Sequence, residues 1–355
     1  MATNLTFAYP GDIDTLTGGY LYDKRVMLCL QDLGWDVRRL SLGEGFPTPS
    51  QNTLDQAITQ LMAVSTDRLL VIDGLALGSF GARAVALAKR HPYIALVHHP
   101  LAKESGLTTQ QAQALFDSEK TTLSHASCVV VTSPTTAGTL AAEYGVNRQN
   151  IHVVIPGLDR PNQRVQPTQS IASKNKPLQF LAVGALVPRK GFDVLLEALH
   201  IALAHDWLLT IVGDASRSPH TTAAIKAQIN ALGLTSRVTL AGSLSPEALA
   251  EQYRCADVFV LASHYEGYGM AYAEALAWGL PVIGTTGGAV EQTVPAEAGL
   301  LVAPGQPEAF AGALVQVLKD PIKRERMRLA AQQHGQHLPT WVDTAKAFAE
   351  VLSKV

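Results

Sequence analysis

Short apolar runs rich in β-branched residues alternate with longer segments of helical period along the chain. The runs predict strands at 5–8, 37–40, 69–72, 94–97, 128–131 and 152–155, and again at 180–183, 208–212, 238–240, 258–261, 281–284 and 300–302. The segments between them predict helices at 20–33, 54–64, 82–89, 110–123 and 135–144, and then at 192–204, 222–232, 246–254, 270–278 and 307–318. This alternation is typical of βα units around a parallel sheet, so we expect an α/β protein.

One polar stretch interrupts the alternation. Residues 160–177 contain three prolines and no apolar period, which indicates an interdomain linker. We therefore expect two doubly wound, Rossmann-like domains, 1–165 and 176–335, with a C-terminal helix at 340–355 joining the first. Two such sheets facing each other would form a cleft. Because open parallel sheets bind ligands beyond the C-terminal ends of their strands, function is sought in the loops after strands.

Composition narrows the class of protein. Of 355 residues, 47% are hydrophobic and 16% charged, which excludes a disordered chain, and the formal charge of −2 provides no general attraction for nucleic acid. Cys29, Cys128 and Cys255 lack metal-ligand or disulfide-framework spacing. The first residues do not have the pattern of a secretory signal, and no apolar run approaches the roughly 20 residues of a membrane span. We therefore expect a cytoplasmic protein.

Several common catalytic motifs are absent from the sequence. No G-x-G-x-x-G follows a strand, and G-x-x-x-x-G-K-[ST], G-x-S-x-G and H-E-x-x-H do not occur. The segment that begins at Gly184 has Arg189 where a P-loop needs its second glycine. These absences disfavour dinucleotide-dependent enzymes, P-loop ATPases and the commonest hydrolases.

Two glycine-bearing loops after predicted strands are suited to anions. Gly18 and Gly19 follow the first strand and open a helix, where exposed backbone N–H groups can approach an anion. Arg189 and Lys190 follow the strand at 180–183, and two adjacent cations are suited to a diphosphate.

A third loop, after the strand at 258–261, carries two carboxylates. It reads SHYEGYGMAYAE, with Glu266 before a helix N-terminus and Glu274 about one turn inside the helix. A carboxylate in the second position can accept paired hydrogen bonds from vicinal hydroxyls, as in a ribose. The spacing predicts a site for a sugar and a ribose on either side of a diphosphate, although a solvated loop with an ordinary surface glutamate is the alternative.

These motifs carry a family resemblance. The run SHYEGYGMAYAEALAWGLPVIGTTGGAVEQTV (263–294), with VGALVPRKGFDVLLEAL (183–199), the glycine pair and SPTTAGTLAAEYGVNRQNIHVVIPGLD (133–159), resembles the family 4 retaining glycosyltransferases of the GT-B fold over nearly the whole chain. The family often has Gly-Arg at the start of the lysine loop, whereas this sequence has Gly184-Ala185.

The resemblance also implies roles for individual residues. Glu274 is expected to hold the donor ribose and Glu266 to contact the transferred sugar. His98 corresponds to the family's active-site histidine, and Arg189 and Lys190 to the groups that stabilise the leaving diphosphate. The remaining donor-binding positions are the glycine pair and the backbone amides at the start of the helix: Gly18, Gly19, Tyr268, Gly269, Met270 and Ala271.

The implied activity is transfer of a hexose from a UDP- or GDP-sugar to a saccharide, lipid or small-molecule acceptor, with retention of configuration. No cofactor or metal is expected, because two cations and loop amides can meet the diphosphate charge and no paired acids follow a strand in the second half. A nucleotide-sugar epimerase or phosphorylase of the same architecture, and a non-catalytic sugar-nucleotide binding protein, remain as alternatives.

Other polar residues receive structural interpretations. Adjacent residues of a strand point apart, which disfavours shared metal ligation by His98 and His99 and leaves His98 as the site residue. Asp73 and Asp159 each follow a strand, where a single acid is commonly a cap, so they are left out of the site. The basic cluster at 319–328 resembles a solvated helix face more than a membrane-binding surface.

Overall fold

The computed structural model describes residues 4–160 and 176–355, which form two compact units. One unit comprises Met1–Gly157 together with Pro339–Val355, and the other comprises Leu158–Leu338. Most of the expected linker, 161–175, lies outside the described residues. Each unit has its own buried hydrophobic core, and each is described below by itself.

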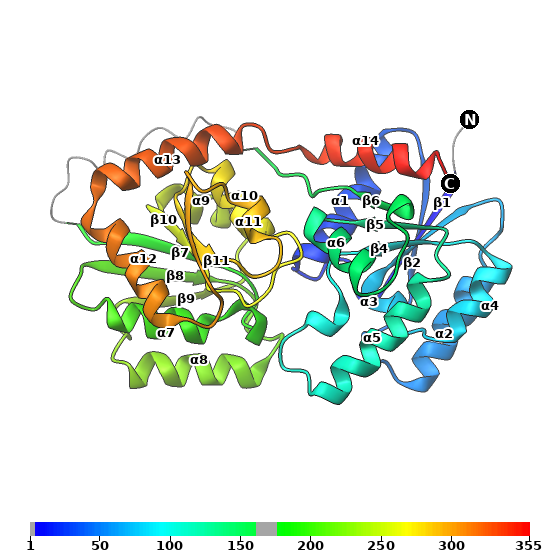
Figure 1. Ribbon diagram of the computed structural model, residues 1–355, viewed down its shortest axis with the longest axis horizontal. Helices are drawn as coiled ribbons and strands as arrows, with labels where there is room; N and C mark the ends of the chain where they lie inside the picture. The colour runs from blue at the N-terminus through cyan, green and yellow to red at the C-terminus, as the bar shows by residue number, and fades with distance from the viewer. Residues whose placement is uncertain (1–3, 161–175) are drawn as a thin grey trace. The chain divides into compact units, whose positions relative to one another are not determined.

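The first unit contains a six-stranded parallel sheet in the order β2-β1-β3-β4-β5-β6 (Figure 1). Its strands are β1 (Asn4–Tyr9), β2 (Asp36–Ser41), β3 (Leu69–Asp73), β4 (Ile94–Val97), β5 (Cys128–Val131) and β6 (Ile151–Val153). Its helices are α1 (Gly18–Asp32), α2 (Gln51–Met62), α3 (Gly74–Leu77), α4 (Arg83–Arg90), α5 (Thr109–Leu123), α6 (Pro134–Ala142) and α14 (Trp341–Leu352), with short 3-10 turns η1 (Leu101–Lys103) and η2 (Arg148–Asn150). Helices α1 and α14 pack together on one face, and α2 and α4 pack together on the other.

The second unit contains another six-stranded parallel sheet, in the order β12-β11-β10-β7-β8-β9. Its strands are β7 (Leu178–Val183), β8 (Trp207–Val212), β9 (Val238–Gly242), β10 (Val258–Val260), β11 (Val282–Thr285) and β12 (Gly299–Val302). Its helical segments are η3 (Pro188–Lys190), α7 (Phe192–Ile201), α8 (Pro219–Ala231), α9 (Pro246–Cys255), α10 (Met270–Ala277), α11 (Val290–Thr293), α12 (Pro307–Lys319) and α13 (Pro321–Gly335).

The central strands form because both of their faces are covered. Strands β4 and β5 read IALV and CVVV, and every residue in them is buried. Continuous apolar β-branched runs of this kind suit a parallel sheet between two helix layers. Side-chain caps then fix where several helices begin: the Ser133 hydroxyl accepts from Thr136 N–H at the start of α6, and Ser245 accepts from Ala248 N–H at the start of α9.

The two α/β sheets predicted from the alternation are confirmed, and all twelve expected strands overlap observed ones. The short helices α3 and α11 were not predicted, because four-residue helices are too short to show a hydrophobic period. The strand expected at 152–155 lies at Ile151–Val153, one residue earlier and shorter.

The strand orders show where the succession of strands along the chain turns back within each parallel sheet. In the first unit the order reverses at β1 and β3, and in the second at β7 and β10. Ligands of open parallel sheets bind at such points, beyond the carboxyl ends of the strands. The loops after β1, β7 and β10, which the sequence singled out, all begin at these positions.

Candidate active site

In the second unit, the loops after β7 and β10 are bound to each other at the reversal point. His264 N–H donates to Arg189 C=O at 2.8 Å. A Cβ on Gly191, where φ is 61°, would lie 2.0 Å from Ala262 O, so only glycine permits this approach. These contacts bring the Arg189-Lys190 turn beside Glu266.

Glu266 lies between both cations. Its Oε1 is 2.7 Å from Lys190 Nζ and accepts from the Ser263 hydroxyl at 2.6 Å, and its Oε2 is 3.2 Å from an Arg189 guanidinium nitrogen. Burial by itself would raise the pKa of the Glu266 carboxyl, but the charges of Lys190 and Arg189 and the Ser263 hydroxyl lower it to about 2. The carboxylate is therefore ionised, buried and paired.

Glu266 is also held through its backbone. Ala289 N–H donates to Glu266 C=O at 2.9 Å, and Glu266 N–H donates to Gly287 C=O at 3.2 Å. At Gly288, where φ is 72°, a Cβ would lie 2.2 Å from Glu266 O. The Gly287-Gly288 turn after β11 is thus the third segment of this loop cluster.

Glu274 lies in the first turns of α10, as the sequence predicts. Its Oε2 accepts from the Tyr253 hydroxyl at 2.7 Å, and the Tyr253 ring stacks on Trp278. Burial raises the pKa of Glu274, and the Tyr253 hydroxyl opposes that shift. The first N–H groups of α10, which include those of Met270 and Ala271, have no carbonyl partner within the helix and remain available to an anion.

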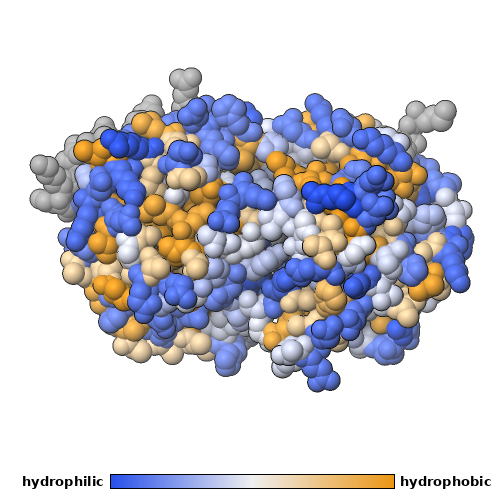
Figure 2. Space-filling model, in the orientation of Figure 1, coloured by the Kyte–Doolittle hydropathy of each residue, from blue (hydrophilic) through white to orange (hydrophobic). Residues whose placement is uncertain are grey.

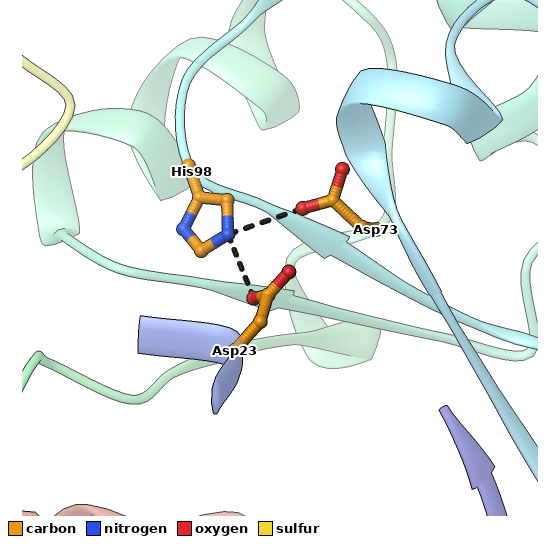
Figure 3. Close-up of side chains that lie close together, drawn as sticks. All are labelled: Asp23, Asp73 and His98. Atoms are coloured by element: carbon orange, nitrogen blue, oxygen red, sulfur yellow. Dashed lines mark hydrogen bonds and ion pairs between the residues drawn. The ribbon is translucent and has the colours of Figure 1, made fainter. Parts of the chain in front are cut away.

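The first unit brings Gly19 and His98 together at its own reversal point. A Cβ on Gly19 would lie 3.2 Å from His98 Cδ2, so the start of α1 lies directly against the imidazole. The ring is held at one nitrogen: His98 Nε2 lies 3.0 Å from Asp23 Oδ1 and 3.2 Å from Asp73 Oδ2 (Figure 3). Gly18 is the first residue of α1.

The two adjacent histidines have different partners, in agreement with the sequence analysis. His99 Nε2 lies 3.0 Å from Glu104 Oε2, away from the His98 cluster. In the described part of the chain, ligand atoms of Asp23, Asp73 and His98 lie within 4.8 Å of one another, a spacing that a cation could also use. The distances from His98 Nε2 to the two carboxylate oxygens are hydrogen-bond distances, and a proton on Nε2 is shared between them.

The assignment of Asp73 to a cap alone needs correction. Asp73 does cap α3, because its Oδ1 accepts from Leu75 N–H at 2.7 Å. Its other oxygen, however, contacts His98, so the residue also belongs to the cluster. A cap uses only one of the two carboxylate oxygens, which leaves the second free for another partner.

The sequence analysis missed Asp23 and Tyr253. Asp23 follows Gly19 by four residues, a spacing that places both on the same face of α1. That periodicity could have identified Asp23. Tyr253 lies on α9, and nothing in the sequence pattern connects it with Glu274, 21 residues later.

The basic residues of α13 are largely occupied by partners in their own unit. Arg328 binds Glu325 with two nitrogens, Arg324 donates to Val317 C=O, and Lys323 donates to Gln316. On the face shown in Figure 2, hydrophilic and hydrophobic residues are interspersed. Among the described residues, no helix combines the length and the apolar character needed to cross a bilayer.

Two known protein families match segments of this chain. The family described as "Glycosyl transferases group 1" matches residues 165–334, and "Glycosyltransferase Family 4" matches residues 67–160. The chain belongs to the family 4 glycosyltransferases. The match to the first description contains the loops of Lys190, Glu266 and Glu274, and the match to the second contains Asp73 and His98.

Curated relatives of this chain include mannosylfructose-phosphate synthase from Agrobacterium fabrum, 29% identical over 61% of this chain and 51% of the relative. D-inositol 3-phosphate glycosyltransferase from Corynebacterium diphtheriae is 30% identical over 73% of this chain and 65% of the relative. The alignments thus span between half and two thirds of these relatives' lengths.

Solved structures show that this family 4 chain has the GT-B fold. Sucrose-phosphate synthase from Thermosynechococcus elongatus aligns with a TM-score of 0.82 at 22% identity, over 99% of both chains. HepE from Anabaena, in complex with UDP-glucose, aligns with a TM-score of 0.77 at 17% identity, over 99% of this chain and 100% of HepE.

Proposed function

We propose that the protein transfers a hexose from a nucleotide-diphosphate sugar to an acceptor, with retention of anomeric configuration. The observation that carries this proposal is the group formed by Glu266, Lys190 and Arg189 beside the N-terminus of α10. Family membership and the UDP-glucose complex of the HepE structure support the class of donor.

Two cations and a helix N-terminus favour a diphosphate leaving group. As the bond between the sugar carbon and the diphosphate oxygen breaks, negative charge grows on that oxygen. Lys190, Arg189 and the first amides of α10 are groups that stabilise such charge, and preorganised donors of this kind contribute strongly to catalysis. This arrangement supports a donor site that works without a metal ion or other cofactor.

Glu266 and Glu274 contact the two parts of the donor on either side of the diphosphate. Glu274, partly exposed and hydrogen-bonded through one oxygen to Tyr253, keeps its other oxygen for the ribose hydroxyls. Glu266 binds the transferred sugar. In the proposed retaining reaction, the acceptor oxygen forms its bond to the anomeric carbon on the face from which the diphosphate leaves, and the acceptor's proton passes to the leaving diphosphate.

We assign the acceptor to the first unit, with His98 as its active-site residue. The acceptor is a saccharide, lipid or small molecule. None of the three cysteines, all within the described residues, forms a disulfide, which supports the cytoplasmic location that we propose.

The experiment that tests this function is a donor panel followed by product analysis. UDP- and GDP-hexoses are first ranked by the thermal shift that they produce, and the best donor is then incubated with a cell extract. We expect mass spectrometry to detect an acceptor that has gained one hexose, with matching release of nucleoside diphosphate, and NMR couplings to show the donor's anomeric configuration in the product. Donor consumption without transfer would favour an epimerase or phosphorylase, and donor binding without consumption would indicate a sensor.

A further inference from the structure

The His98 imidazole is held at a single nitrogen by two buried carboxylates. The Asp23 side chain is 0% exposed, that of Asp73 5%, and that of His98 18%. The three residues come from different elements, namely α1, the end of β3 and the segment that follows β4 (Figure 3). Only the folded chain therefore brings them together.

A proton on the ring lowers the net charge of this cluster from two negative charges to one. The ion pairs of Asp23 and Asp73 among the described residues are with His98, and Asp23 Oδ2 is buried without a hydrogen-bond donor there. A neutral ring would place two buried carboxylates around one shared proton, and buried charges are costly unless they are paired. An imidazolium offsets one of these two negative charges, and burial together with the neighbouring Asp73 raises the pKa of Asp23 above its ordinary value.

The other groups described around the His98 ring carry no positive charge. The Tyr22 ring meets the imidazole edge-on at 5.3 Å, and the Thr132 hydroxyl donates to His98 C=O. On the neighbouring position, His99 is paired with Glu104. Burial lowers the pKa of His98, but the charges and hydrogen bonds of Asp23 and Asp73 outweigh burial and raise it.

The opposite edge of the ring is available to a ligand. With Nε2 directed at the carboxylates, Nδ1 lies on the other side of the ring (Figure 3) and has no hydrogen-bond partner among the described residues. Protonation turns Nδ1 from an acceptor into a charged donor, whose natural partner is an oxygen atom of a hydroxyl or phosphate.

We propose that Asp23 and Asp73 are positioning residues that hold His98 as an imidazolium and present its Nδ1–H to an oxygen of the substrate. This inference rests on the proposed function for the identity of the substrate, but the charge and orientation of the ring are properties of the free protein. They can therefore be tested without a donor or an acceptor.

The test is a pH titration of histidine-labelled protein by NMR, with the His98 signal assigned through its loss in His98→Gln. We expect His98 to remain protonated at pH 8 in the wild type. Asp23→Asn and Asp73→Asn, each confirmed as folded by thermal unfolding, should shift the titration of His98 down by at least about one pH unit. Glu104→Gln, which alters only the partner of His99, should leave it unchanged.

Activity provides a second readout. Once a transfer assay exists, Asp23→Asn should lower kcat at pH 8 by about tenfold or more, with a smaller loss at pH 6, where the ring is protonated again. A simple loss of structure would not produce this pH dependence. If no transfer is found, the proposed function fails while the NMR result still decides the charge of His98.

Three results would overturn the inference. The first is a wild-type His98 that titrates near the ordinary value of imidazole. The second is an unchanged titration in both asparagine variants. The third is displacement of the ring proton by one equivalent of Zn²⁺, which would make the cluster a metal site instead.

Discussion

Lys190 is already neutralised before any ligand binds. Its side chain passes over Gly184, where a Cβ would lie 3.0 Å from Lys190 Cε, and ends 2.7 Å from Glu266. In the proposed donor complex, the diphosphate competes with Glu266 for this charge. Arg189 shares the same carboxylate and also donates to Tyr265 C=O at 2.7 Å, so part of its guanidinium is bound to the backbone of the loop after β10.

This difference predicts unequal effects of the two cations on turnover. Lys190→Met keeps the packing of the aliphatic stem and removes the charge, so we expect kcat to fall about 100- to 1,000-fold, as when one donor to a developing oxyanion is removed. Arg189→Met should cost less. Steady-state kinetics at saturating acceptor measure both, with Lys226→Met, an exposed change on α8, as the control. A Lys190→Met enzyme close to wild type would remove this loop from the donor site.

A second prediction at this scale concerns Glu274. Glu274→Gln keeps the size of the side chain and the acceptor for Tyr253 but loses the charge, so nucleotide affinity should fall about 10- to 100-fold. Tyr253→Phe, which frees only one carboxylate oxygen, should have a smaller effect. Calorimetry with the free nucleoside diphosphate measures these affinities, and equal binding by Glu274→Gln and wild type would argue against a ribose contact.

Residues of the site differ in how far sequence could predict them. Glu266 and Lys190 lie in short glycine-bearing segments directly after strands, and Glu274 lies in the helix that follows, so the expectation of a ligand site there rests on local pattern. Asp23 and Tyr253 lie within helices, and Asp73 has the sequence context of an ordinary cap. The four-residue spacing from Gly19 marks the helix face of Asp23, but the partners of all three residues depend on how α1, β3 and α9 pack, which is a tertiary property.

At the scale of elements, α5 carries a buried carboxyl that supports the turn after His99. Glu119 is 2% exposed, and its Oε2 accepts from Leu101 N–H at 3.1 Å, at the start of η1. Burial raises the pKa of Glu119 to about 8, although the Leu101 amide and Tyr144 oppose the shift. The carboxyl is therefore protonated in the folded protein at neutral pH.

This predicts a pH-dependent stability. Between about pH 4.5 and pH 8 the folded state holds a proton that the unfolded state releases, so the stabilising contribution of Glu119 is complete at low pH and is lost as the pH rises through 8. Glu119→Gln should remove this dependence and melt several degrees above wild type at pH 9. Thermal unfolding measures it, with the exposed Asp117→Asn of the same helix as control. A variant that melts below wild type at pH 9 would contradict the account.

At the scale of the whole molecule, the chain returns to its first unit at the C-terminus. A Cβ on Gly157 would lie 2.4 Å from Trp341 N. The backbone segment that leaves this unit and the one that re-enters it are therefore in direct contact. Helix α14 then packs on α1, and Phe348, fully buried, lies beside Phe7 of β1. The alternation of strands and helices predicts both sheets, because burial on two faces dictates it, and α14 lies in the first unit, where the sequence analysis expected a C-terminal helix at 340–355.

Phe348→Ala should consequently destabilise the first unit by about 3–5 kcal/mol. The loss follows from the cavity left between α14 and β1. Hydrogen exchange followed by mass spectrometry should show faster exchange in β1 and α1 and unchanged exchange in β7 and β10, while Val342→Ala, exposed on the same helix, serves as the control. Equal acceleration in both units would mean that they do not unfold separately.

The most direct test of the donor site is a crystal structure with the nucleoside diphosphate that gives the largest thermal shift. The account predicts a phosphate oxygen within hydrogen-bond distance of Lys190 Nζ and of the first amides of α10, and both ribose hydroxyls on Glu274. A nucleotide bound elsewhere, with Lys190 still paired to Glu266 and Glu274 without a ligand, would contradict it.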